Sequence, residues 1–140
     1  MTGTVLLVED EDQVKRLVTK VLEMRGYTVL SADSSAHALT LSDGHAGHID
    51  LLLADVELDK HMNGQELAKL LRRTRPAMRV LYTSGYALEN CVEHGGAKIK
   101  KEIQELMAAF LPKPFTPSGL MEKVSSTLTD MPVQGISAKL

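Results

Sequence analysis

Aromatic residues and cysteine are scarce in this chain. Its 140 residues include no tryptophan, three tyrosines, two phenylalanines and one cysteine, Cys91. A lone cysteine cannot form an internal disulfide, so the fold must be stable without one, and we expect a reducing compartment. Free cysteine usually behaves as a small, partly buried side chain, and we expect the same of Cys91.

The sequence also lacks long apolar runs and an excess of one charge. No apolar run approaches the roughly 18 residues that a membrane helix needs, and acidic residues begin at Glu9 with no basic leader before them. Lysine and arginine total 16 against 18 aspartates and glutamates, so the net charge is -2 and no dense basic face is expected. We therefore expect a cytoplasmic protein that contacts neither nucleic acid nor membrane directly.

The rest of the composition is that of an ordinary globular domain. Hydrophobic residues make up 44% and charged residues 24% of the chain, and both values are close to the average. Residues 4–129 carry regular apolar patterning and are predicted to form one domain. Residues 130–140 contain proline and glycine with few periodic apolar positions, and they are predicted to be a C-terminal tail or linker.

Short apolar runs alternate along the chain with segments of helical periodicity. The runs at 5–8, 27–30, 51–54, 80–83 and 110–111 are predicted strands. Helices are predicted over 14–22, over 35–44 after a cap at Ser34 or Ser35, from 63 to before Pro76, over 88–92, over 97–109, and from Thr116 to about 128. This alternation predicts an α/β fold: a doubly wound five-stranded parallel sheet of flavodoxin-like order 2-1-3-4-5, with helices on both faces.

Polar residues lie at or just beyond the ends of four of the predicted strands. Glu9 and Asp10 follow the first strand, Asp55 the third, Ser84 the fourth and Lys113 the fifth. Because ligands bind at the carboxyl ends of parallel strands, these side chains should converge on one edge of the sheet. Crowded carboxylates repel one another unless a cation lies among them, and acidic oxygens are the ligands that Mg²⁺ prefers. A carboxylate beside such a cation can accept a phosphoryl group.

Four segments, VLLVEDE, LLLADVELDKHMNGQEL, VLYTSGY and FLPKPF, resemble the signature segments of the bacterial response-regulator receiver family. The resemblance covers residues 4–129. It implies that Asp55 is the phosphoacceptor, that Ser84 binds the phosphoryl oxygen and that Lys113 pairs with it. It also implies that Mg²⁺ is held by Glu9, Asp10, Asp55 and the backbone carbonyl of Glu57.

The resemblance further implies how the domain operates. Phe110, three positions before Lys113, occupies the place of the aromatic switch residue, and the Lys113-Pro114 bond is cis in the family. Phosphate would come from a histidine kinase or a histidine phosphotransfer protein, and a homodimer could form through the fourth helix, fifth strand and fifth helix. The chain would be a phosphoacceptor switch rather than an enzyme, and its TSGY and KPF segments look most similar to receivers of hybrid kinases.

Each assignment has a structural alternative. Asp10 could serve simply as a helix cap, and Asp55 and Ser84 could be turn residues. Lys113 could be a solvated lysine and Phe110 a core residue. The histidines are expected to be loop or surface residues, without metal-ligand spacing: His37, His45, His48, His61 and His94.

The sequence also departs from the family, and other functions stay open. Asp59 stands where the family usually has proline, and Glu57 brings another negative charge beside the site. One alternative function is a receiver-like interaction module that works without phosphorylation. The other is a small Mg²⁺-dependent phosphatase in which Asp55 is the nucleophile and Glu57 the general acid.

Overall fold

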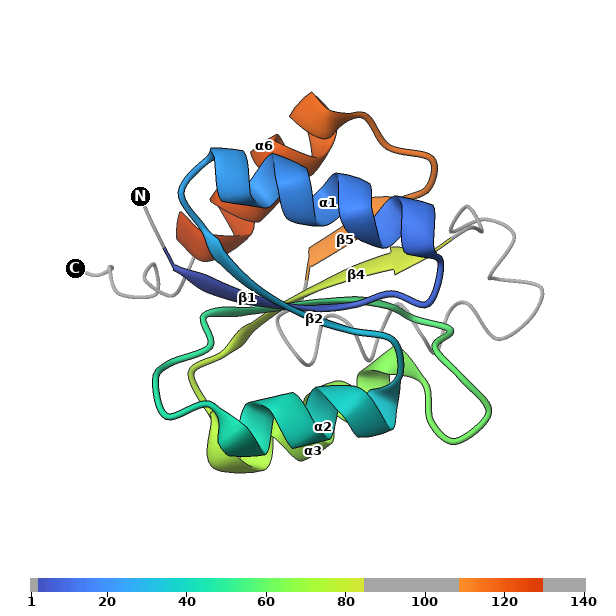
Figure 1. The fold of residues 1–140 in the computed structure, drawn as a ribbon, viewed down its shortest axis with the longest axis vertical. Coiled ribbons are helices and arrows are strands. Elements are labelled where there is room, and N and C mark those ends of the chain that lie inside the picture. The colour runs from blue at the N-terminus through green and yellow to red at the C-terminus, as the bar shows by residue number, and fades with distance from the viewer. Residues whose placement is uncertain (1–2, 85–108, 130–140) are drawn as a thin grey trace.

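A computed structural model describes residues 3–84 and 109–129 of the chain, and these form one parallel sheet between two layers of helices (Figure 1). The strands are β1 (Thr4–Val8), β2 (Thr28–Ala32), β3 (Leu51–Asp55), β4 (Arg79–Ser84) and β5 (Ala109–Pro112). Their order in the sheet is β2-β1-β3-β4-β5, and every neighbouring pair is parallel. The predicted fold class and strand order are confirmed.

Within residues 3–84 and 109–129, two helices cover each face of the sheet. Helices α1 (Asp12–Met24) and α6 (Pro117–Thr129) lie together on one face, and α2 (Ser35–Gly44) and α3 (Gly64–Thr74) lie on the other (Figure 1). The predicted helix over 88–92 and all but the last residue of the helix predicted over 97–109 fall outside the described residues, as do Cys91, His94 and the predicted tail. Within the described ranges, no helix has both the length and the apolar character to cross a membrane.

The predicted caps fix where the helices begin. Ser34, rather than Ser35, caps α2. The Asn63 side chain accepts from the backbone N–H of Glu66, while the Glu66 side chain accepts from that of Asn63, which closes a capping box at α3. Thr116 Oγ1 accepts a hydrogen bond from the Gly119 amide at 2.9 Å and caps α6 before its first residue, a proline.

The start of the fifth strand differs from the prediction. Ala109 was predicted to be the last helical residue, but it is the first residue of β5 and pairs with Leu81. Phe110, which shares the helical spacing of the preceding apolar residues, lies in the strand opposite Tyr82. Pairing with a buried strand therefore overrides local periodicity here. The sheet order places β5 at an edge, where Pro112 can lie without a backbone donor.

Strand side chains alternate between two cores. Residues under α2 and α3 include Leu6, Leu52, Val80 and Tyr82. Residues under α1 and α6 include Val5, Leu7, Leu51, Leu53, Leu81 and Leu111. Each strand is therefore apolar on both faces, which explains its continuous apolar run in the sequence. Leu17 of α1 has the predicted helical spacing but is 47% exposed, so the apolar stripe of this helix is wider than its buried face.

Candidate functional site

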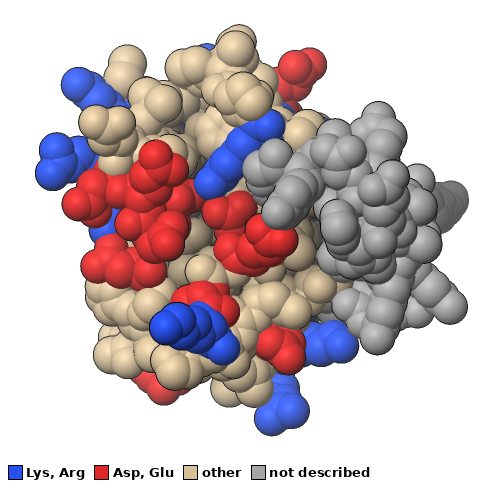
Figure 2. Space-filling model, turned by 90° about the vertical axis from the view of Figure 1, so that its right-hand side faces the viewer, with Lys and Arg blue, Asp and Glu red and all other residues tan. Residues whose placement is uncertain are grey.

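Acidic side chains gather at the edge where the parallel strands end. Asp55 is the last residue of β3, Glu9 directly follows β1 and Asp33 directly follows β2. Figure 2 looks onto the side toward which the strands point in Figure 1, and acidic side chains cluster there with a few basic side chains among them. Neighbouring carboxylates repel one another, so the stability of this cluster depends on where the positively charged side chains lie.

Lys113 bridges two of these carboxylates. Its Nζ lies 3.0 Å from Asp55 Oδ2 and 3.1 Å from Glu9 Oε1. The Glu9 side chain is 5% exposed and that of Asp55 17%, so both charges are largely removed from water. A buried carboxylate is stable only when a cation or hydrogen-bond donors satisfy it. The ammonium group of Lys113 supplies that positive charge to both acids.

The two carboxylates in turn keep Lys113 charged. Burial by itself lowers the pKa of a lysine because it penalises the ammonium form. The hydrogen bond and charge of Asp55, together with those of Glu9, more than offset this penalty and raise the pKa of Lys113 above its ordinary value of 10.5. The bridge is therefore a cluster of one ammonium group and two carboxylates, in which Lys113 is the shared partner.

The second oxygen of Asp55 has a different partner. Thr83 Oγ1 donates a hydrogen bond to Asp55 Oδ1 at 3.1 Å, and the backbone carbonyl of Thr83 accepts from the amide of Val56 at 2.8 Å. Thr83 is the register partner of Asp55 across β3 and β4, and it is buried. The sequence analysis missed this residue. A hydroxyl near the end of an otherwise apolar strand is the signal that could have found it.

The remaining acids of the predicted metal site are less closely gathered. Asp10 and Glu57 are exposed, while Glu9 Oε2 accepts from the backbone amide of Glu11 at 3.1 Å. Over residues 3–84 and 109–129, no group of three or more His, Cys, Asp or Glu side chains is close enough to hold a metal ion. Glu9 and Asp55 thus meet through Lys113, and Asp10 stands apart from them.

The two predicted switch residues lie on neighbouring strands. The backbone of Ser84 ends β4 and pairs with Pro112, and its side chain lies outside the described part of the structure. Phe110 is partly buried against the core under α2 and α3. The Lys113-Pro114 peptide bond is cis.

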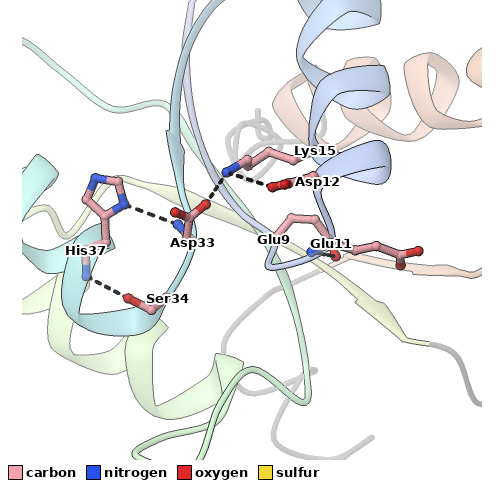
Figure 3. Close-up of polar contacts among 7 residues, drawn as sticks. All are labelled: Glu9, Glu11, Asp12, Lys15, Asp33, Ser34 and His37. Carbon is pink, nitrogen blue, oxygen red and sulfur yellow. Dashed lines mark hydrogen bonds and ion pairs between the residues drawn. The ribbon is translucent and has the colours of Figure 1, made fainter.

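Lys15 supplies a second ammonium group at this edge (Figure 3). Its Nζ donates to Asp33 Oδ1 and lies 3.8 Å from Asp12 Oδ1. The hydrogen bond between Lys15 and Asp33 raises the pKa of the lysine and lowers that of the carboxyl. The contact joins α1 to the loop after β2. In the same loop the Asp33 amide donates to Nδ1 of His37, which is exposed as predicted.

Asp59 organises the loop between β3 and α3. Its carboxylate accepts from the backbone amides of Ser35, His61 and Met62 at 2.9 to 3.1 Å. The Ser35 amide opens α2, so this acid ties the loop to a helix start where negative charge is favourable. The Ser35 amide lowers the pKa of Asp59 most, and with the other donors brings it to about 2 despite some desolvation. Asp59, which stands where the family usually has a rigid proline, therefore orders this loop through a network of hydrogen bonds instead.

The fold and this edge define an α/β domain with a lysine-bridged pair of carboxylates at the carboxyl end of a flavodoxin-like sheet. A sequence profile described as response regulator receiver domain matches residues 5–125. The chain belongs to this family, whose members receive the signal in two-component systems. The resemblance seen in the four sequence segments is therefore confirmed.

Several relatives give the scale of the similarity. Sensor kinase CckA of Brucella abortus (strain 2308) is 35% identical over 130 residues, which is 93% of this chain and 12% of the kinase. Transcriptional regulatory protein CpxR of Escherichia coli (strain K12) is 31% identical over 126 residues, 89% of this chain and 48% of CpxR. The chain thus spans less than half of either relative.

Solved structures agree with the fold. The receiver domain from hybrid histidine kinase CckA superposes with a TM-score of 0.72 at 34% identity, over 90% of this chain and 99% of that one. A CheY-like response regulator receiver domain protein from Methanospirillum hungatei JF-1 gives a TM-score of 0.73 at 28% identity, over 91% and 94% of the two chains.

Gly64 should be essential for the backbone position of Asp55. A Cβ at Gly64 would lie 2.2 Å from the backbone oxygen of Asp55, whereas a Cβ at Gly44 would have nothing within 4 Å. We expect Gly64→Ala to lower the free energy of unfolding in urea by about 2 kcal/mol through steric strain. Gly44→Ala, the matched control in α2, should leave it unchanged or raise it slightly. Equal effects of the two substitutions would contradict the close approach.

The charge of Asp59 should make stability depend on pH. Its folded-state pKa of about 2 lies below the ordinary value of 3.8, so the folded chain binds this proton more weakly than the unfolded chain. The resulting stabilisation is present above about pH 4 and is lost as the pH falls through about 2. We expect Asp59→Asn to lower the free energy of unfolding at pH 7, with a difference that shrinks toward pH 2. A difference that stays constant over this range would show that the charge is unimportant.

Proposed function

We propose that this domain is a signalling switch that accepts a phosphoryl group on Asp55 from a phosphohistidine. The observation that carries the proposal is the position of the Asp55 carboxylate, which ends β3 at the carboxyl edge of the sheet with Lys113 Nζ 3.0 Å from Oδ2. Membership of the receiver family supports the same role. The cognate protein would be a histidine kinase or a histidine phosphotransfer protein.

The proposed reaction needs a nucleophile and a positive charge at one place. An Asp55 carboxylate oxygen would form a bond to phosphorus while the P–N bond of the phosphohistidine breaks, and the electron pair of that bond would stay on the imidazole nitrogen. Charge on the transferring group is spread over its phosphoryl oxygens. Lys113, already within hydrogen-bond distance of Asp55, would stabilise that charge, and Ser84 at the end of β4 would bind one phosphoryl oxygen.

The donor set fits Mg²⁺ in its chemistry. The residues that would hold the ion are Glu9, Asp10, Asp55 and the backbone carbonyl of Glu57, and all of these supply oxygen ligands. Glu9 and Asp55 already share one cation, the ammonium of Lys113. When bound, Mg²⁺ would neutralise the phosphoryl oxygens and the crowded acids. Asp10 is exposed and free of the core, so its side chain can turn toward the other two.

Partner binding would read out the phosphorylated state. Ser84 and Phe110 would couple the new charge to a face that comprises β5, α6 and the predicted helix beginning at 88–92, through which a homodimer could form. An apolar pocket of about 380 Å³ borders Lys113 and offers a separate contact for the phosphate donor. It is lined by Val14, Leu17, Lys113, Pro114 and Phe115.

A cytoplasmic location, and the absence of direct nucleic-acid or membrane binding, stay predictions.

Intact-protein mass spectrometry after incubation with phosphoramidate and Mg²⁺ tests the proposal. We expect one added phosphoryl group on the unmodified chain, no adduct when EDTA replaces Mg²⁺, and no adduct on Asp55→Asn. Asp43→Asn, which changes an exposed acid of α2, is the matched control and should keep the adduct.

A folded chain that stays unlabelled would favour the interaction module that works without phosphorylation. Rapid turnover of general phosphomonoesters that depends on Asp55 would instead favour the phosphatase. An adduct that persists on Asp55→Asn would place the acceptor elsewhere and overturn the assignment.

A further inference from the structure

The Asp55 carboxylate is held through both of its oxygens, by donors of different kinds. Lys113 Nζ, a cation, lies 3.0 Å from Oδ2, and Thr83 Oγ1, a neutral hydroxyl, donates to Oδ1 at 3.1 Å. Two bonds to the two oxygens fix the plane of a carboxylate, whereas one bond leaves it free to rotate. The side chain is only 17% exposed, so water contributes little to its orientation.

The sheet itself determines which residue reaches Oδ1. Asp55 and Thr83 are Cα partners in the parallel β3–β4 pair, so their side chains leave the sheet on the same face. Thr83 is 4% exposed, and its backbone carbonyl also holds the Val56 amide at 2.8 Å. Thr83 is therefore held at two points. Its backbone carbonyl is bonded to Val56, and its hydroxyl is bonded to Asp55, the proposed phosphoacceptor.

We propose that Thr83 is a positioning residue for phosphoryl transfer, which orients the Asp55 carboxylate and shortens the lifetime of its phosphorylated form. This inference rests on the proposed role of Asp55 as phosphoacceptor. The Thr83 hydroxyl contacts the Asp55 carboxylate, and its proposed effect on the reaction passes through Asp55.

The sign of the effect follows from the charge of the acceptor. During hydrolysis a water oxygen forms a bond to phosphorus, the bond from phosphorus to the Asp55 oxygen breaks with its electron pair on the carboxylate, and inorganic phosphate leaves with the water proton passing to solvent. A hydrogen bond to a charged carboxylate is stronger than one to the neutral carbonyl of an acyl phosphate. The Thr83 donor therefore stabilises the departing carboxylate more than the phosphorylated ground state.

The experiment compares residues at this position that differ in the hydroxyl group. The full chain and four variants, Thr83→Val, Thr83→Ser, Thr83→Ala and Thr127→Val, are labelled with phosphoramidate and Mg²⁺. The donor is then removed, and loss of the adduct is followed by intact mass. Thr127→Val is the matched control, because Thr127 is also a buried threonine but its hydroxyl donates to the backbone carbonyl of Lys123 in α6.

We expect the adduct to persist about fivefold longer on Thr83→Val than on the unmodified chain, from the difference between charged and neutral hydrogen bonds. Thr83→Ser should restore the faster decay, and Thr83→Ala should decay as slowly as Thr83→Val. Thr127→Val should decay at the original rate. If Thr83→Val does not fold, the serine and alanine variants still differ only by the hydroxyl oxygen.

Equal lifetimes for the serine and alanine variants would overturn the inference, since the hydroxyl would then have no influence. A change as large in Thr127→Val would also overturn it, because lost stability alone would then explain the effect. Failure of the unmodified chain to label would instead refute Asp55 as phosphoacceptor, so the two hypotheses fail in distinguishable ways.

Discussion

The bridge from Lys113 to Glu9 and Asp55 is the interaction on which the rest of the site depends. Two carboxylates this deeply buried would be strongly destabilising if the cation were removed. The partners are separated by 104 and 58 residues in the sequence, so no local preference can bring them together. They meet only because β1, β3 and β5 run in the same direction and end at one edge of the sheet.

The alternation of strand side chains then selects which residues meet there. Val5, Leu7, Leu51, Leu53, Leu81 and Leu111 all face the core under α1 and α6. Two positions beyond the last of these side chains in β1, β3, β4 and β5 come Glu9, Asp55, Thr83 and Lys113, respectively. The charged site therefore continues the same face that packs the hydrophobic core, and the packing of α1 and α6 also positions the chemistry.

Much of this arrangement could be predicted from the sequence. Continuous apolar runs identified the buried strands, and capping residues such as Asn63 identified the helix starts, because both signals are local. Strand ends identified Glu9, Asp55 and Lys113, because parallel strands must end at a common edge. Ala109 was assigned to a helix because its neighbours have helical spacing, and only pairing with Leu81 shows that it belongs to a strand.

Other features depend on register or on backbone donors that a sequence does not reveal. The bond from Thr83 to Asp55 requires that the two residues pair across β3 and β4, which no local pattern encodes. Asp59 looked like a disruption of the family pattern, yet it accepts backbone hydrogen bonds from Ser35, His61 and Met62. The ion pair of Lys15 and Asp33 likewise joins a helix to a distant loop.

The affinity for Mg²⁺ with and without the Lys113 ammonium tests the central claim most directly. If Lys113 balances the charge of Glu9 and Asp55, its removal should strengthen the binding of Mg²⁺, because the ion would no longer share these acids with an ammonium group. Calorimetric titration of Lys113→Met should therefore show Mg²⁺ binding at least several-fold tighter than in the unmodified chain. Lys15→Met, which removes a cation bound to Asp33, should change the affinity less. Equal or weaker binding by Lys113→Met would contradict the account.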